Sequence, residues 1–291
     1  MAKSYIFNHD DNFKELIPCP LCSSNHFSLW ASENGFDCVR CSSCGLLFVN
    51  PRPTMNTIEQ AVTHGVHSLD GMGKINVRAR REAHKVSSNK RLIKSLFGEI
   101  IHNSKPFSWL DIGAGYGELV EALLKIAPRG SRIEGIEPMS FKVNYAQSLG
   151  LPIRACYLNK ITSSYDFISI LDIFSHIPDF RSFLKDIKEV LNPEGQILIK
   201  TGNAADIGHR RNFPGPLTLP DHLVFAGKKQ LARFLDEAGF DIVSFTEDRI
   251  DGFIYCAKNA VKWILRKPVI LSFPYNSPTR TLLIRAKLKK I

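Results

Sequence analysis

The sequence predicts an α/β protein: a doubly wound, mostly parallel seven-stranded sheet with a small cysteine-rich module at its N-terminal end. Three observations support this fold class. An apolar run at 109–112 leads into three alternating glycines, apolar and amphipathic segments alternate after Phe107, and four cysteines form two CxxC pairs before residue 45. Strands that alternate with helices indicate a parallel sheet that is covered by helices on both faces.

Length and composition are those of a globular protein. The chain has 291 residues, a formal net charge of +10 and 44% hydrophobic residues, enough for one α/β domain and a smaller module. No apolar run approaches the eighteen or so residues that span a bilayer, and no apolar leader follows Met1. We therefore expect a cytoplasmic protein, with a possible peripheral contact to the inner face of the membrane.

The N-terminal cysteines predict a zinc-ribbon module over residues 1–53. The pairs Cys19/Cys22 and Cys41/Cys44 each place two thiolates on one tight turn, and two such turns complete a tetrahedral site. Four thiolates leave no open coordination position, so the expected Zn²⁺ is structural. Cys38 forms an overlapping pair with Cys41, and the spacing alone leaves open whether it replaces another ligand.

Residues 54–105 are predicted to be a helical linker. The stretch 54–73 contains two histidines and three glycines and is interpreted as a mobile connection. The stretch 74–94 is strongly basic, and apolar residues then recur at helical spacing up to Ile101. Its charge could contact an anionic substrate, but a solvated helix face is the favoured interpretation.

Residues 106–257 are predicted to form the α/β domain. Its strands are expected at 109–112, 132–137, 152–155, 165–172, 196–200, 241–246 and 252–257, with helices between them. The helix at 180–191 has the clearest amphipathic pattern and ends at Asn192 and Pro193.

The glycine-rich turn after the first strand indicates which nucleotide would bind. Gly113, Gly115 and Gly117 are followed by Glu118 where a dinucleotide fingerprint needs a small residue, which disfavours NAD, and no lysine follows to hold a triphosphate. Asp111 before the turn suits an ammonium group, and Glu137 at the end of the next strand suits ribose hydroxyls. S-adenosylmethionine carries both groups and no phosphate.

Four motifs strengthen this interpretation. Residues 110–117, 135–138, 172–179 and 191–196 resemble, in order, the glycine-rich motif, the ribose-binding acid, the segment that closes over the cofactor and the helix-to-strand turn of class I S-adenosylmethionine-dependent methyltransferases. The resemblance implies a Rossmann-like methyltransferase fold and a set of cofactor-binding residues: Asp111, Gly113, Ala114, Gly115, Gly117, Glu137, Pro138, Asp172 and Ile173. Glu194 replaces a common glycine, and Cys156 and Tyr157 stand where many relatives carry an acid that contacts adenine.

The acceptor is suggested by resemblance alone. The cysteine module with residues 50–53, and the later segment 220–225, are similar to bacterial members that accompany sugar, polysaccharide and secondary-metabolite pathways. The resemblance thus implies a small-molecule acceptor: a sugar, a sugar nucleotide or a glycan or lipid-linked precursor. An RNA methyltransferase that grips nucleic acid with the zinc ribbon and basic segments is the alternative, but no basic run interleaved with aromatic residues lies near the expected crevice. A degenerate cofactor-binding scaffold without activity is a third possibility.

Two histidines are candidate catalytic residues. Transfer to a hydroxyl requires a base, and His222 lies in the loop region 201–226, which follows a strand at its carboxyl end. His176 follows the fourth strand and is the second candidate. Loop anchoring for His222, and a helix start for His176, are the corresponding structural roles.

Residues 258–291 are expected to form a basic tail outside the α/β domain. No acidic residue occurs after Asp251, whereas cations alternate with Trp263, Ile264, Leu265 and further apolar residues. A membrane surface, nucleic acid or docking on the domain would each suit this composition. Docking with some membrane-surface affinity is favoured, because three prolines prevent one long amphipathic helix.

Overall fold

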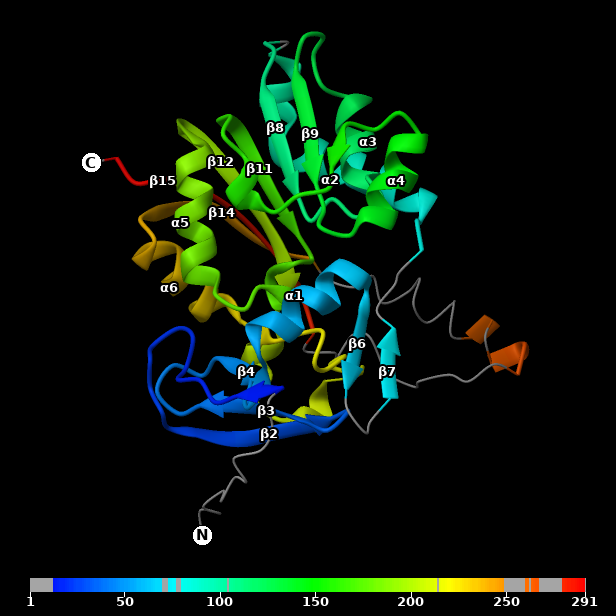
Figure 1. Cartoon of the computed structure of the whole chain (residues 1–291). Coiled ribbons are helices and arrows are strands. Elements are labelled where there is room, and N and C mark those ends of the chain that lie inside the picture. Colours follow the sequence, from blue (N-terminus) through cyan, green and yellow to red (C-terminus); the bar gives the residue numbers. More distant parts are fainter. Residues whose placement is uncertain are drawn as a thin grey trace.

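The computed structural model describes residues 13–69, 73–76, 80–103, 105–213, 215–248, 260–261, 263–266 and 279–290. Its central feature is the predicted seven-stranded sheet, in the order β10-β9-β8-β11-β12-β15-β14 (Figure 1). Five neighbouring strands run parallel: β10 (Ile153–Arg154), β9 (Arg132–Ile136), β8 (Ser108–Ile112), β11 (Tyr165–Leu171) and β12 (Leu191–Gly202). The remaining two strands, β15 (Thr281–Leu288) and β14 (Phe240–Asp248), are antiparallel to their neighbours.

Helices cover both faces of this sheet, as the alternation of the strand residues requires. Ile168 and Ile170 pack in one core cluster with α5 (Phe180–Val190) and α6 (Lys228–Glu237). Phe167, one residue out of phase, packs in the other cluster, on the face covered by α2 (Ala83–His102), α3 (Glu118–Leu124) and α4 (Ser140–Ser148). Successive side chains of a strand point to opposite faces, so both faces of β11 are apolar.

The C-terminal part of the sheet differs from the expectation. Residues 252–257, expected as the last strand, lie outside the described residues. The last strand is instead β15, so the expectation of a tail outside the domain is wrong for Thr281–Leu288. Its cation Arg285 does not mark a solvated strand, because the guanidinium lies over the Phe97 ring at 4.3 Å and donates to Gln196 in the neighbouring strand.

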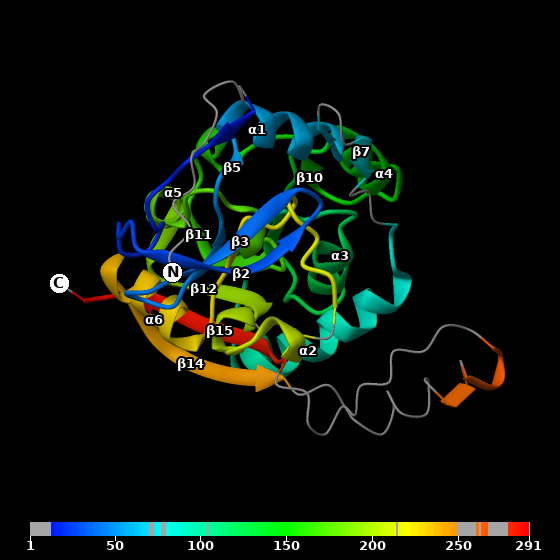
Figure 2. The same cartoon turned by 90° about the horizontal axis from the view of Figure 1, so that it is seen from below.

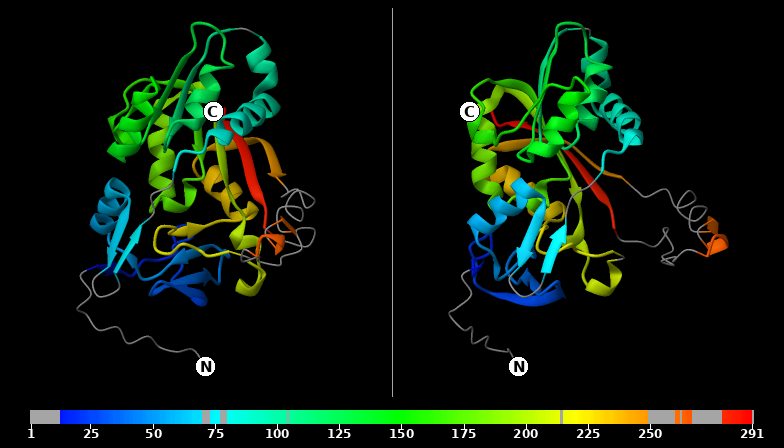
Figure 3. Two further views of the ribbon diagram at one scale, coloured as in Figure 1. Left: turned by 90° about the vertical axis from the view of Figure 1, so that its right-hand side faces the viewer. Right: turned by 45° about the vertical axis from the view of Figure 1, so that its right-hand side comes forward.

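The N-terminal module forms a second sheet together with a strand from the α/β domain. Its order is β13-β4-β3-β2, and all neighbours are antiparallel: β2 is Phe27–Glu33, β3 is Phe36–Cys41, β4 is Leu47–Val49 and β13 is Val224–Phe225. Figure 2 and Figure 3 show this sheet beside the segment that follows β12. The short β1 (Lys14–Glu15) pairs with β5 (Arg52–Pro53). The module therefore shares a sheet with the body of the molecule.

The stretch 54–73 contains regular structure where the sequence suggested a mobile connection. Met55–His64 is a helix, α1, which ends at Gly65 in the left-handed conformation (φ +68°). A two-stranded hairpin follows, made of β6 (Val66–Leu69) and β7 (Gly73–Asn76). Ile58 and Ala61 of α1 are buried. Three apolar residues of this short helix are buried or half-buried. This number is too small to produce a clear helical periodicity in the sequence.

Candidate functional site

A cavity of about 680 Å³ lies at the carboxyl ends of β8, β9, β11 and β12. In an open α/β sheet this is the edge at which ligands bind. All of the cofactor-binding candidates except Gly117 line it, as do both candidate histidines: Asp111, Gly113, Ala114, Gly115, Glu137, Pro138, Asp172, Ile173, His176 and His222. The topology thus brings together residues that are spread over more than a hundred positions of the chain.

The glycines of the turn have separate steric roles. All three have positive φ, a conformation that side chains rarely adopt. A Cβ at Gly113 would stand 2.6 Å from a methyl carbon of Ile173, and a Cβ at Gly117 would stand 2.6 Å from Leu151. Gly115 has no atom within 4 Å of its Cβ direction, so it faces open space in the cavity. Gly113 and Gly117 permit packing, and Gly115 permits close approach of a ligand.

Glu137 is held by backbone amides of the turns on either side of it. One carboxylate oxygen accepts the Gly115 N–H at 3.0 Å, and the other accepts the Met139 N–H at 3.1 Å. A carboxylate offers about four lone-pair positions, so both oxygens retain capacity for hydroxyl donors. The geometry fits a residue that is oriented in advance to receive a pair of ribose hydroxyls.

Asp111 is a fully buried acid whose charge is only partly compensated. Its Oδ1 accepts the Ser169 hydroxyl at 2.6 Å, and Ser169 in turn accepts the Trp109 indole N–H at 3.0 Å. Burial raises the pKa of Asp111 to about 7, and the Ser169 hydrogen bond opposes this shift, while nearby Glu137 adds to it. A cation in the cavity would favour the ionised carboxylate.

Asp172 has an unusual backbone conformation at the end of β11. Its φ is +60°, a left-handed value at a residue with a side chain, and its Oδ2 lies 2.7 Å from Lys200 Nζ at the end of β12. Strained backbone of this kind concentrates at functional sites. The following residue, Ile173, covers Gly113, and the short helix Phe174–His176 comes next.

The two histidines lie against each other, with ring centroids 4.7 Å apart at an interplanar angle of 70°. His222 Nδ1 lies 2.8 Å from the Leu217 carbonyl oxygen, and because a carbonyl only accepts, Nδ1 carries the proton. The Nε2 lone pair of the neutral ring is then free to accept. Burial lowers the pKa of His222 below its ordinary value, and nearby His176 lowers it further. His176 Nδ1 contacts Asp221 through the backbone oxygen at 2.9 Å.

Sequence reasoning missed one wall of the cavity. Met55, Ile58 and Val62 of α1 face it from the stretch expected to be a connection. Ile177 and Phe183, beyond the fourth strand, add to the same apolar lining. The spacing i, i+3, i+7 at 55–62 was the available signal, but only a tertiary contact shows what such a short stripe covers. The basic stretch contributes Arg80 and Lys85 to the lining.

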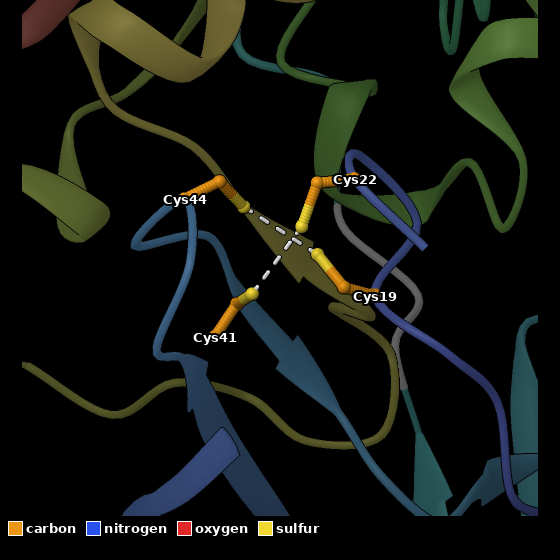
Figure 4. A group of neighbouring side chains, drawn as sticks. All are labelled: Cys19, Cys22, Cys41 and Cys44. Atoms are coloured by element: carbon orange, nitrogen blue, oxygen red, sulfur yellow. Dashed lines mark hydrogen bonds between the residues drawn. The ribbon is translucent and has the colours of Figure 1, made fainter. Parts of the chain in front are cut away.

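The four predicted zinc ligands converge outside this cavity. Sγ of Cys19 lies 3.5 Å from that of Cys44, and Sγ of Cys22 lies 3.5 Å from that of Cys41 (Figure 4). Tetrahedral Zn–S bonds of about 2.3 Å place sulfurs roughly 3.8 Å apart, so the cluster has nearly the required size. Cys38 is not part of the cluster and packs in a separate apolar cluster. Burial raises the pKa of the Cys38 thiol to about 12.

The fold and the cavity together define a class I S-adenosylmethionine-dependent methyltransferase. Residues 79–245 match a family described as a methyltransferase domain, which is more than half of the chain. The chain therefore belongs to this methyltransferase family. The PH0226 protein from Pyrococcus horikoshii OT3 shares the fold, with a TM-score of 0.50, 11% identity and coverage of 73% of this chain and 93% of that one.

Curated relatives include ubiquinone biosynthesis O-methyltransferases. The protein from Aeromonas salmonicida (strain A449) is 26% identical over 148 residues, which are 45% of this chain and 61% of the relative. The protein from Actinobacillus pleuropneumoniae serotype 7 (strain AP76) is 30% identical over 112 residues, 32% of this chain and 45% of the relative. The chain thus spans about half the length of the curated relatives it matches. Among the described residues, no helix is long and apolar enough to cross a bilayer.

Proposed function

We propose that this methyltransferase transfers a methyl group to a hydroxyl oxygen on a small, largely apolar ring, with His222 as the general base. The observation that carries the proposal is the His222 ring on the cavity wall, whose Nδ1 is engaged by the Leu217 carbonyl, so that Nε2 is the nitrogen that can accept a proton. A base must lie within hydrogen-bond reach of the proton that it removes. The curated relatives are O-methyltransferases by name, which supports oxygen as the acceptor atom.

Different residues of the cavity would bind the methyl donor and deprotonate the acceptor. S-adenosylmethionine supplies an electrophilic methyl group on a cationic sulfur. Glu137 orients the ribose, Asp111 faces the cationic part of the donor, and Gly115 lets the donor lie against the backbone. His222 removes the acceptor proton as the oxygen attacks in line, and much of the rate arises from holding the two reactants in this geometry.

The shape of the acceptor follows from the wall that α1 and α5 provide. Met55, Ile58, Val62 and Phe183 present apolar surface, which suits a planar ring better than a sugar with many hydroxyls. The sugar, sugar nucleotide or glycan-type acceptor implied by sequence resemblance stays a prediction without support from the comparisons. An RNA acceptor is less favoured, because Arg40 of the ribbon is engaged by the Ala205 and Ile207 carbonyls.

The test is methyl transfer from labelled S-adenosylmethionine to a panel of phenols, catechols such as 3,4-dihydroxybenzoate, monosaccharides and nucleotide sugars. We expect methyl ethers of ring hydroxyls. His222→Ala should lower kcat by about 10²-fold or more while donor affinity stays the same. His176→Ala is the matched variant. Near-normal turnover of His222→Ala on the best acceptor would remove His222 from the base role.

The pH profile gives an independent check of the same role. Because burial holds the pKa of His222 below 6.5, the ring is already neutral at pH 7. We expect kcat to be constant from pH 7 to 8 and to fall at acid pH with a midpoint below 6.5, in a chain that has Asp111 replaced by asparagine to remove its titration. A profile that still rises steeply between pH 7 and 8 would contradict a His222 base.

We also propose that Cys19, Cys22, Cys41 and Cys44 bind one structural Zn²⁺. The sulfur separations support zinc binding. Four thiolates fill the tetrahedral coordination of Zn²⁺, which supports a structural role. Metal analysis of the purified protein should find about one equivalent of zinc. Cys22→Ser should lose it, whereas Cys38→Ser, which changes the buried thiol outside the cluster, should retain it.

A peripheral contact with an anionic membrane surface is proposed for the segment around Trp263. The side chains of Val261, Trp263, Ile264 and Leu265 are between 54% and 75% exposed, and this short helical turn lies away from the sheet in Figure 3. Cations flank it in the sequence, a composition that suits an anionic interface. Co-sedimentation with phosphatidylglycerol vesicles at low salt should occur and should weaken in Trp263→Ser. Absence of binding at low salt would refute the contact.

A further inference from the structure

The turn that carries His222 is hydrogen-bonded to one carboxylate of the N-terminal module. Glu33, the last residue of β2, accepts three consecutive backbone N–H groups: Leu217 at 2.8 Å on Oε2, and Thr218 at 2.6 Å and Leu219 at 3.3 Å on Oε1. Asn34 adds a hydrogen bond from its side-chain amide to the Leu219 carbonyl at 2.7 Å. Two adjacent residues at the tip of the β2–β3 hairpin therefore form hydrogen bonds with the backbone of segment 217–219.

The same segment determines where the His222 ring lies. Leu217, whose N–H is bound by Glu33, uses its carbonyl to accept the His222 Nδ1–H. The Thr218 carbonyl accepts the His222 N–H at 3.1 Å. A continuous path of hydrogen bonds thus runs from the Glu33 carboxylate through two peptide groups to both the ring and the backbone of His222.

The conformation of this turn needs such an anchor. Thr218 has φ +62°, and a β-branched residue adopts this left-handed conformation only when its surroundings impose it. Hydrogen bonds to a charged acceptor are stronger than those between neutral groups. Three of them on one carboxylate are sufficient to hold a conformation that the chain alone would leave.

We infer that Glu33 is a positioning residue for His222, so that the N-terminal module completes the active site. The inference rests on the proposed base role of His222. The module reaches this position because its other contacts are fixed: Gln230 of α6 donates to the Cys44 carbonyl, and Arg181 of α5 donates to the Pro20 carbonyl. The hairpin spans from the cysteine cluster, where Phe27 pairs with Cys41, to its tip, where Glu33 pairs with Phe36.

The experiment compares Glu33→Ala, the near-isosteric Glu33→Gln and the control Asp37→Asn in the full chain with S-adenosylmethionine bound. Asp37 lies on the same hairpin, and its carboxylate accepts from Ser32 rather than from the 217–222 segment. The first readout is amide hydrogen exchange of residues 217–223, which does not depend on turnover. We expect faster exchange there in Glu33→Ala by tenfold or more, a smaller change in Glu33→Gln, and no change in Asp37→Asn or in α3 of any variant.

The second readout connects the turn to catalysis. We expect kcat on the best acceptor of the panel to fall about 10- to 100-fold in Glu33→Ala, as for a misplaced reacting group, with partial rescue in Glu33→Gln and an unchanged Kd for the donor. Nitrogen chemical shifts of the His222 imidazole should show loss of the fixed Nδ1–H tautomer. His176, Asp221 and Glu33 are the ionisable groups that act on this ring, so the shifts of all variants are recorded at one common pH.

Each result has one consequence for the inference. Unchanged exchange at 217–223 in Glu33→Ala overturns it, whatever His222→Ala does. Faster exchange together with normal turnover also overturns the positioning role, because the turn would then be dispensable for catalysis. Normal turnover of His222→Ala would instead refute the base role of His222, and the exchange and tautomer results would still decide whether Glu33 holds the ring. If Glu33→Ala fails to fold, the hydrogen exchange at 217–223 and the kcat of Glu33→Gln decide the inference by the same criteria.

Discussion

At the scale of single residues, Asp111 and the glycines beside it combine burial with positive φ angles at the proposed donor site. The carboxyl of Asp111 stays largely uncharged at acid pH because it is buried, with Ser169 as its hydrogen-bond partner. Gly115 has a backbone conformation that other residues avoid, and it faces empty space. Both features become useful when a cationic ligand fills that space.

Gly115→Ala separates the backbone effect from the binding effect. Gly150 has a similar positive φ of +74° and also has no atom near its Cβ direction, but it lies at the end of α4 outside the cavity. Alanine at either position should lower the free energy of unfolding by about 1–2 kcal/mol, the cost of a left-handed alanine. Only Gly115→Ala should weaken binding of S-adenosylmethionine in a calorimetric titration. Equal donor affinity in the two variants would contradict a direct contact at Gly115.

The raised pKa of Asp111 predicts that donor affinity depends on pH. The cationic donor favours the ionised carboxylate, so binding below pH 7 must first remove a proton. The Kd should rise as the pH falls from 7 to 5, by about tenfold per unit at most. The stability of the ligand-free protein has the opposite pH dependence. Burial favours the neutral Asp111 in the folded state, so the contribution of Asp111 to the free energy of unfolding is lost as the pH rises towards 7. Titration calorimetry of Asp111→Asn should remove the Asp111 part of the Kd slope.

At the scale of elements, sequence reasoning located the segments that carry strong local signals. The glycine turn, Glu137 at the end of β9 and the amphipathic α5 were expected where they occur, because each has a pattern set by its own chemistry. The role of α1 could not be predicted, since its function arises from which cavity its apolar stripe covers. β15 was not predicted because the cations of 258–291 suggested a basic tail outside the α/β domain, whereas the Phe97 ring and the Gln196 amide hold the Arg285 side chain against the sheet.

The α1 wall predicts a substitution that affects the acceptor alone. Val62 lines the cavity, and Val62→Asn would replace part of the apolar wall that faces the proposed ring with a polar amide. We expect KM for the acceptor to rise about tenfold, with an unchanged donor Kd. Gln60→Ala changes an exposed residue on the opposite side of the same helix and should behave like the parent. Equal KM values for the two variants would place the acceptor elsewhere.

At the scale of the whole molecule, the cysteine module is part of one core. Cys19, Leu21 and Phe48 pack in the same apolar cluster as Ile199 and Ile284 of the main sheet. The cluster of four cysteines could be predicted because the CxxC spacing is local, but nothing in the sequence indicated that β13 pairs with β4 across about 175 residues. The boundary expected at residue 53 is therefore a change of composition within a continuous core.

This continuity predicts a single unfolding transition. Cys22→Ser should lower the melting temperature of the entire protein in one calorimetric peak, because losing the fourth thiolate weakens a module that shares its core with the sheet. Cys156→Ser, at a thiol outside the cysteine cluster, is the control. Two separate peaks, of which only the smaller moves, would mean that the module unfolds by itself.

The position of β15 has a consequence for how the chain is made. Within the described part of the sheet, β14 is joined to the other strands only through β15, which lies between β14 and β12. During synthesis from the N-terminus, β14 must therefore leave the ribosome before its partner strand exists. Both β12 and β14 then keep open hydrogen-bonding edges until Leu288 has been added, and such edges pair readily with other chains. A chain interrupted before Thr281 would retain the glycine-rich turn 113–117 and still be prone to aggregate.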